Sequence, residues 1–454
     1  MSEHLKRRSK LVYGFGDTGF SLTGTIIGVY FAIFLTDVVG ISPSLAAAAI
    51  FIGRSWDYIN DPLIGHISDR TRTRWGRRRP FLLFGALPFA LSFVMLWWRP
   101  PWTNQITLAI YYACAYIIFD ASATFVYMPY FALTPELTLD YDERTSLTSY
   151  RMFFSILGSL VAFTVPLMIV GGIAPERASH FLSMGLIFGL VSMLPLFLVF
   201  MGTRERPAFM QQEQPKLLNS LKAAARNRPF VFSVAIFLLT WVAIDILQAT
   251  LLYFIKYVVQ RESQSDMIMG LIFITAIFAL PIWAWLSRIW SKRWAYVAGI
   301  SFWAVVQLVL ISLNASTSLT LILSLCVLAG VGVGAAHVLP WSIIPDAIEW
   351  DEWQTGQRHE GIFYSLVTLM QKVATSIAIP LTLVLLGATG YVPNAPEQPA
   401  SAIMGIRLVI GPIPAALLCL GIAFAVLYPL GREQHAKVVA ELENRRMSGR
   451  APLP

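Results

Sequence analysis

The residues best suited to chemistry lie in one run, RSWDYINDPLIG, at residues 54–65. Asp57 and Asp61 are four residues apart, so on an α-helix they share one face a turn apart, with Asn60 beside them. Two carboxylates held this close in a dry site repel each other, so they bind a cation such as Na⁺ or share one proton. We therefore predict a cation site here, and we weigh it against a purely structural ion pair between Arg54 and one carboxylate.

Other polar and aromatic residues are scattered through apolar stretches, as expected if several helices line one cavity. Aromatic rings beside hydrogen-bonding groups suit a sugar, whose apolar face stacks and whose hydroxyls need partners. Lys372 lies within an apolar stretch and needs an acidic partner, for which Asp57 or Asp61 is the natural candidate. His66 and His337 are interpreted as packing residues rather than proton relays. The residues predicted to line the cavity are Asp17, Asp120, Tyr127, Phe131, Arg151, Trp341 and Lys372, with Thr124 one turn from Asp120.

The elements that hold these residues are apolar blocks. Of the 454 residues, 56% are hydrophobic and only 13% are charged, whereas a soluble domain has about 25% charged residues. A disordered chain is excluded for the same reason. Helices of about 20 apolar residues span a bilayer. Twelve such blocks lie near residues 18–36, 44–67, 81–98, 106–133, 148–172, 180–201, 230–256, 266–287, 295–313, 317–345, 361–387 and 405–431.

Lys and Arg gather in alternate loops between these blocks, which accounts for the net charge of +8 and places both termini in the cytoplasm. The longest interior polar segment follows the sixth block and divides the chain six plus six. We predict an all-α membrane protein of two six-helix bundles, residues 1–201 and 230–431. A cytoplasmic linker (202–229) joins them, and a cytoplasmic tail (432–454) follows.

The loop from Gly65 to Pro80 is strongly basic. Its position between two spans favours a role in topology and gating over nucleic-acid binding, with Asp69, Arg70, Arg77 and Arg78 pairing against neighbouring helix ends. The three cysteines show neither disulfide nor zinc spacing. No P-loop, HExxH or GxSxG motif occurs in a suitable context, so we expect neither enzyme chemistry nor a cofactor.

Several motifs together resemble the glycoside-pentoside-hexuronide:cation symporters of the major facilitator superfamily, of the melibiose permease type. The resemblance covers nearly the whole chain and includes Lys372. It implies the major-facilitator fold of twelve helices and alternating access between its two halves. The motifs are YGFGD from Tyr13, LTDVVG from Leu35, WDYINDPLIGHISDRTRTRWGRRRPF from Trp56, MPYFALTPELTLDYDERTSL from Met128, PWSIIPDAIEWDEWQTGQRHEGIFYS from Pro340 and GYVPN from Gly390.

Carried over by position, the family's cation site maps onto Asp57, Asp61, Asn60 and Thr124, and its lysine maps onto Lys372. A third carboxylate position of the family holds Tyr127 here, so the choice between Na⁺ and H⁺ stays open. The family's galactoside-binding positions hold Ser21, Phe131 and Met152 here, with Arg151 one position away and Asp17 displaced from the first of them. The resemblance therefore implies the transport mechanism and leaves the sugar open.

We expect a cation-coupled symporter, driven by Na⁺ or H⁺, that imports a sugar or glycoside through a bacterial inner membrane. Its partners would be the small-molecule substrate and the bilayer, with no nucleic acid, and we expect a monomer. One alternative is a transporter of the same fold for an amphiphile such as a lysophospholipid. A second alternative is a nontransporting sensor or membrane enzyme that shares the fold.

Overall fold

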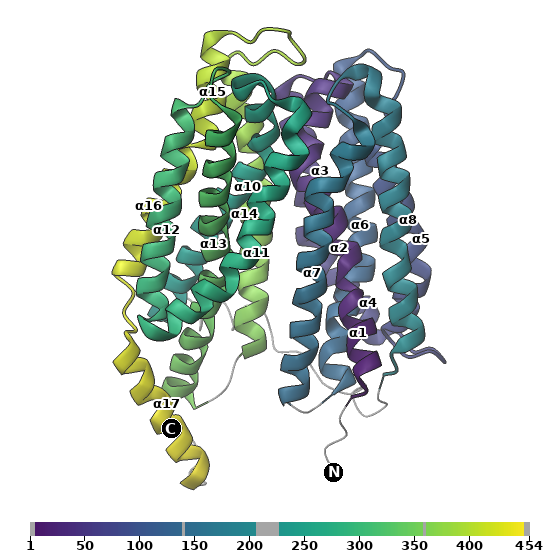
Figure 1. Cartoon of the computed structure of the whole chain (residues 1–454). Helices are drawn as coiled ribbons and strands as arrows, with labels where there is room; N and C mark the ends of the chain where they lie inside the picture. Colours follow the sequence, from purple (N-terminus) through teal and green to yellow (C-terminus); the bar gives the residue numbers. More distant parts are fainter. Residues whose placement is uncertain (1–4, 139–140, 206–226, 357–359, 449–454) are drawn as a thin grey trace. The chain divides into compact units, whose positions relative to one another are not determined.

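The helices of the computed structural model follow the apolar blocks of the sequence (Figure 1). The structure describes residues 5–138, 141–205, 227–356 and 360–448. Within these ranges every regular element is a helix, apart from a single bridge between Thr73 and Gly76. The prediction of an all-helical chain is confirmed, whereas most of the predicted linker, 202–229, lies outside the described residues.

Ten helical segments in the described ranges are long and apolar enough to cross a membrane. The most apolar stretch of each segment contains at most two charged side chains, so it can cross the bilayer as a helix. The segments are α5 (Arg79–Trp97), α6 (Gln105–Leu137), α7 (Tyr141–Val170), α8 (Ala178–Gly202), α10 (Arg228–Tyr253) with η5 (Phe254–Val259), α11 (Ser265–Ile289), α12 (Lys292–Val309), α13 (Leu319–Thr355), α14 (Glu360–Ala388), and α15 (Ala400–Ile410) with α16 (Pro412–Val426).

Two further spans are divided into shorter segments. The first runs through α1 (Arg7–Phe15), α2 (Asp17–Ile26) and the π-helical turns η1 (Ile27–Phe31) and η2 (Phe34–Val39); the second through α3 (Pro43–Ser55) and α4 (Asp57–Arg70). At each division one amide bonds three residues back, from Gly16 to Tyr13 and from Trp56 to Gly53. One turn is therefore tightened at each division. These two spans and the ten segments above give the predicted twelve.

The chain forms two compact units. Unit 1 contains Met1–Gln212, Gln248–Gly270 and Ile379–Gly405, and unit 2 contains the remaining segments Glu213–Leu247, Leu271–Ala378 and Ile406–Pro454. In unit 1, α5 packs against α6 and α8, α2 packs against α7, and α3 and α4 pack against α6. Glycine has no Cβ atom, so it also lets α2 approach α8 closely. A Cβ on Gly19 of α2 would lie 2.5 Å from the carbonyl oxygen of Ser192 on α8.

In unit 2, α12 packs against α13 and α16, and a Cβ on Gly332 of α13 would lie 2.4 Å from Trp303 Cβ of α12. A buried apolar cluster joins α10, α13 and α14 and includes Phe237, Ile344 and Phe363. The helix α17 (Arg432–Ser448) follows α16 and packs against the end of α13 (Figure 1).

Candidate cation and substrate sites

The two carboxylates of the predicted cation site converge on one hydroxyl of a neighbouring helix. Thr124 Oγ1 on α6 lies 3.2 Å from Asp57 Oδ1 and 3.3 Å from Asp61 Oδ1 on α4. A threonine hydroxyl carries one hydrogen, so it donates to one carboxylate at a time and offers lone pairs besides. Three oxygen atoms from two helices thus meet at one point, and oxygen is the ligand that hard cations take.

Local sequence places the pair at this point. The tightened turn at Trp56 ends α3, and α4 begins at Asp57. Pro62 follows Asp61 inside α4 and supplies no amide hydrogen, which loosens the helix beside the second carboxylate. The two acids therefore lie in the first turns of α4, next to the tightened turn.

Asn60 is 4% exposed, and its Nδ2 atom has no hydrogen-bond partner among the described residues. The oxygen and nitrogen of an asparagine amide exchange places by a half turn, so the amide offers either a donor or an acceptor to an occupant of the site. Arg54, at the end of α3, donates from Nε to the Tyr116 hydroxyl at 2.8 Å. One role of Arg54 is therefore to tie α3 to α6.

Several residues predicted to line the substrate cavity gather elsewhere in unit 1. Phe20 and Tyr127 have ring centroids 3.5 Å apart, and Tyr127 and Phe131 are 4.9 Å apart. The Arg151 guanidinium lies 4.7 Å from the centre of the Phe131 ring, a cation–π contact. Asp17 is 7% exposed. Its carboxylate hydrogen-bonds Ser155 and is attracted by the positive charge of Arg151. The structure thus brings together Asp17, Tyr127, Phe131 and Arg151, from α2, α6 and α7.

A second ring layer supports this group. Tyr13 stacks on Tyr130 with centroids 5.0 Å apart. The Tyr130 hydroxyl donates to the Tyr13 carbonyl oxygen at 2.6 Å, and the Tyr13 hydroxyl pairs with Thr134. These contacts hold α1 against α6, so the positions of the aromatic rings are fixed by hydrogen bonds as well as by packing.

The remaining predicted cavity residues are less concentrated. Asp120 lies on α6 one turn before Thr124. In unit 2, Trp341 contacts Phe237 edge to face at 4.6 Å beside the apolar cluster, and Lys372 lies partly exposed in the middle of α14. His337 Nδ1 lies 2.9 Å from the Val333 carbonyl oxygen, as a packing residue would. The pairing of Lys372 with an aspartate of α4 stays a prediction.

The arginines of the basic loop meet two glutamates. Arg77 Nη2 lies 2.6 Å and Arg78 Nε 3.1 Å from Glu136 Oε1 at the end of α6. The Glu205 carboxylate accepts from the backbone N–H groups of residues 77–79 at 2.6–2.9 Å, which neutralises the N-terminus of α5. Arg70 ends α4 and is exposed, and the side chain of Asp69 lies outside the described residues.

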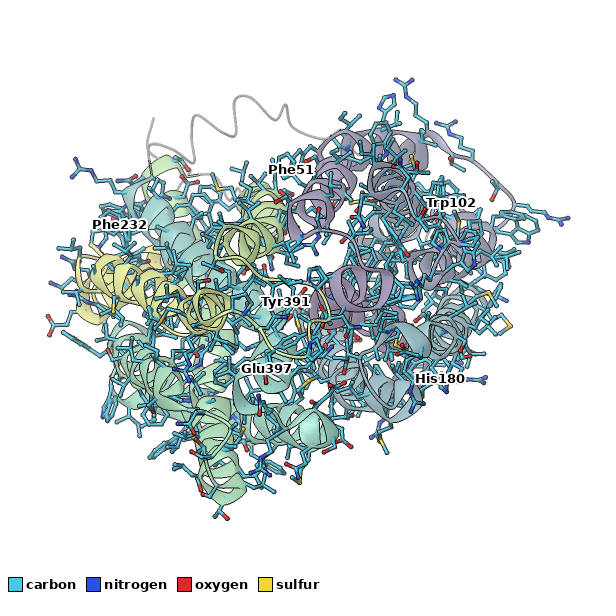
Figure 2. The ribbon with its side chains drawn as sticks, turned by 90° about the horizontal axis from the view of Figure 1, so that it is seen from above. Phe51, Trp102, His180, Phe232, Tyr391 and Glu397 are labelled. Carbon is cyan, nitrogen blue, oxygen red and sulfur yellow. The ribbon has the colours of Figure 1, made fainter. Side chains whose placement is uncertain are left out.

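A buried charge cluster in unit 1 has no role in the sequence analysis. We call it the Asp37 cluster: Asp37, Lys256, Tyr257, Tyr391, Thr36 and Tyr253. Asp37 on η2 is 1% exposed, and its carboxylate receives Lys256 Nζ at 2.7 Å, Thr36 Oγ1 at 3.0 Å, and the hydroxyls of Tyr257 and Tyr391. These contacts join Asp37 to Lys256, which lies 219 residues further along the chain, and to Tyr391, which lies 354 residues further along. Of these residues, Figure 2 labels Tyr391.

The donors of the Asp37 cluster are themselves anchored. Lys256 Nζ also donates to the Ile173 carbonyl oxygen at 2.7 Å, and the Tyr253 hydroxyl lies 2.9 Å from Thr36 Oγ1. Burial, followed by the charge of Asp37, raises the pKa of Tyr391 well above its ordinary value, so this phenol keeps its proton and donates. LTDVVG and GYVPN mark two segments of the cluster in the sequence.

An all-helical fold of twelve spans with a carboxylate pair inside the second span defines a membrane transporter of the major-facilitator type. The chain belongs to the MFS/sugar transport protein family, whose model matches residues 12–432.

Known relatives agree with this class. The chain is 32% identical to the uncharacterised symporter sll1374 of Synechocystis sp., across 98% of each chain. It is 29% identical to the sodium-dependent lysophosphatidylcholine symporter 1-A of Danio rerio, across 94% of this chain and 86% of the relative. A crystal structure of a bacterial homologue of the lysosomal transporter Spinster has the same fold, with a TM-score of 0.66, 12% identity and coverage of 95% of this chain and 97% of the other. The relatives are transporters, so the prediction of a symporter rather than an enzyme is confirmed.

Proposed function

We propose that this protein is a Na⁺-coupled symporter that takes up a small organic solute by alternating access. The proposal rests on the meeting of Asp57, Asp61 and Thr124 oxygens within a membrane span. The moving parts would be residues 1–201 and 230–431, joined by the linker 202–229. The protein would act as a monomer in a bacterial inner membrane, with both termini in the cytoplasm.

Two observations favour Na⁺ over H⁺. The site offers oxygens from three side chains, which suits a hard cation. Sodium dependence is also stated for the lysophosphatidylcholine symporter of Danio rerio. Proton coupling through the same pair is the second candidate, because two adjacent carboxylates can share one proton. Sodium-dependent binding at constant pH distinguishes the two.

The charge of the acidic pair can couple the binding of the cation to the binding of the solute. Two adjacent carboxylates attract a cation such as Lys372, their predicted partner. A bound Na⁺ neutralises part of that charge, so cation and solute favour the same conformation, which is thermodynamic coupling between two sites. One charge moving down 100 mV releases about 2.3 kcal/mol, which is enough to accumulate a solute.

The first substrate candidate is a lysophospholipid. Arg151 offers a guanidinium, which suits a phosphate, and the rings of Tyr127 and Phe131 suit an apolar chain or a quaternary ammonium group. Phe131 and Met152 replace groups that bind galactosides in the family resembled above, so the sugar-binding pattern is broken. The lysophosphatidylcholine relative extends over 94% of this chain, so the resemblance includes both halves.

The second substrate candidate is a sugar or glycoside. Asp17, Arg151 and Tyr127 could bind hydroxyls while Phe131 stacks on the sugar ring. The description of the matching family includes sugar transport. A sugar and a lysophospholipid make different demands on Phe131: a Phe131→Trp change should preserve stacking on a sugar and obstruct an acyl chain.

The test uses the purified full-length protein in liposomes with an inward Na⁺ gradient at constant pH. Radiolabelled lysophosphatidylcholine and melibiose serve as the two probes, with choline chloride replacing NaCl as the control for ionic strength. We expect accumulation of one probe that requires the Na⁺ gradient. Accumulation driven equally well by a pH gradient without Na⁺ would favour proton coupling. Binding of a probe without accumulation under either gradient would favour the sensor alternative and contradict the proposal.

A further inference from the structure

The C-terminal helix α17 docks by one face on the end of α13. Val438 and Leu442 are 4% and 6% exposed, and His435 and Arg445 are partly buried. In chain order the four residues, His435, Val438, Leu442 and Arg445, are three, four and three positions apart, so they form one stripe along the helix. Most of the other described residues of α17 are exposed. This spacing is that of an amphipathic helix seated on a protein surface.

Polar contacts fasten both ends of the docked helix. Near its start, Arg432 Nη1 donates to the Ile289 carbonyl oxygen at 2.8 Å. Near its end, Trp353 Nε1 donates to Glu441 Oε2 and Arg445 Nη1 donates to the Trp353 carbonyl oxygen, both at 2.9 Å. Helix α17 therefore contacts the ends of α11 and α13 together.

The one titratable histidine of the docked stripe faces two carboxylates. His435 Nε2 lies 2.5 Å from Glu349 Oε2 and 3.5 Å from Asp346 Oδ1, both on α13. Lys292, the first residue of α12, contributes the opposing charge, with Nζ 2.5 Å from Asp346 Oδ1. The hydrogen bond that His435 donates to Glu349, then the charges of Asp346 and Glu349, raise the pKa of His435 above its ordinary 6.5, against the opposing effects of burial and of Lys292.

We propose that α17 is a pH-sensitive strap: it stays docked on α13 while His435 is protonated and is released when His435 loses its proton. An imidazolium between two carboxylates binds both, whereas a neutral imidazole keeps at most one hydrogen bond. The docked state is favoured fully below the ordinary pKa of histidine and loses this contribution as the pH rises through the raised pKa.

Release has a physical consequence beyond the lost ion pair. A free helix of 17 residues is marginal in water, so α17 would fray and expose Val438 and Leu442. The end of α13 would lose its cover, and Trp341 lies on that helix. If the protein is the proposed symporter, an alkaline cytoplasm would therefore change the mobility of a helix that moves during transport.

Hydrogen exchange of the full-length protein in nanodiscs tests docking without any transport assay, so its result does not depend on the proposed substrate or ion. Exchange of residues 432–448 is measured at about pH 6 and about pH 9 and corrected for the intrinsic pH dependence of amide exchange. Each unit by which docking raises the pKa changes the docking constant about tenfold. We therefore expect the protection of α17 to be lower at the higher pH.

Three variants separate titration from packing. His435→Gln retains a donor but cannot titrate, so it should remove the pH dependence, and Glu349→Gln should move the transition to lower pH. Trp353→Phe should weaken docking equally at both pH values. The control is His180→Gln, at the exposed start of α8 (Figure 2), which should behave as the unmodified chain. Equal protection at both pH values, or an undiminished pH effect in His435→Gln, would overturn the proposal.

Discussion

The acidic pair of α4 and the Asp37 cluster both hold carboxylates inside unit 1, but the first brings two carboxylates together and the second holds one. Asp57 and Asp61 converge on the single hydroxyl of Thr124. Asp37 alone receives a lysine ammonium, two phenols and the Thr36 hydroxyl. The first arrangement brings two carboxylates together at one hydroxyl, whereas the second surrounds one carboxylate with a lysine ammonium and three hydroxyls.

The difference indicates different roles. A carboxylate that a lysine and three hydroxyls already satisfy has little to gain from an added cation, so the Asp37 cluster serves to hold η2, η5 and the segment around Tyr391 together. Two carboxylates held close together repel each other, so an added cation stabilises them. In the proposed transport cycle, the acidic pair would exchange its ion.

The largest expected effect is on the acidic pair. Asp57→Asn removes one of the two negative charges, so Na⁺-driven accumulation in liposomes should fall to the equilibrium level while the protein stays folded. Asp266→Asn, which removes a carboxylate at the start of α11, is the matched control and should leave accumulation intact. Undiminished uphill uptake by Asp57→Asn would exclude the pair as the coupling site.

The next effect is on stability. Lys256→Met leaves the buried Asp37 carboxylate without its cation and should destabilise the protein by about 3–5 kcal/mol. The double variant Lys256→Met, Asp37→Asn removes the stranded charge and should recover much of the loss, as measured by thermal unfolding in detergent. If the double variant were as unstable as the single one, the ion pair would not be the source of the effect.

A smaller effect separates charged from neutral hydrogen bonds. Tyr391→Phe removes a donor to a carboxylate and should cost about 1.5–3 kcal/mol of stability. Tyr111→Phe removes a donor to the Met95 carbonyl oxygen and should cost about 0.5–1.5 kcal/mol. Equal losses in the two variants would show that the carboxylate of Asp37 does not strengthen its hydrogen bonds.

The smallest effect is expected at the shared hydroxyl. Thr124→Val keeps the shape of the side chain but removes one oxygen from the cation site, so the Na⁺ concentration for half-maximal thermal stabilisation should rise by about tenfold. Thr164→Val on α7, whose hydroxyl bonds its own helix at Leu160, is the control. An unchanged Na⁺ requirement in Thr124→Val would remove Thr124 from the site.

The sequence predicted those features that depend on local spacing. Apolar blocks gave the spans, and the four-residue spacing of Asp57 and Asp61 gave a pair on one face. The family resemblance assigned Thr124 to the cation site. The sequence did not predict the Asp37 cluster, although LTDVVG and GYVPN mark two of its segments, because Tyr391 lies 354 residues from Asp37. The sequence also did not predict that the tail packs against α13.

By itself, the sequence determined that this chain is helical, spans a membrane many times and carries an acidic pair within a span. These properties follow from hydropathy and from the 3.6-residue helical period, which act between near neighbours. Only the tertiary structure decided that both acids meet at Thr124, that four donors surround Asp37, and that His435 lies between two carboxylates of α13. Such contacts depend on how distant helices pack, and a local period carries no information about which distant residue fills the facing position.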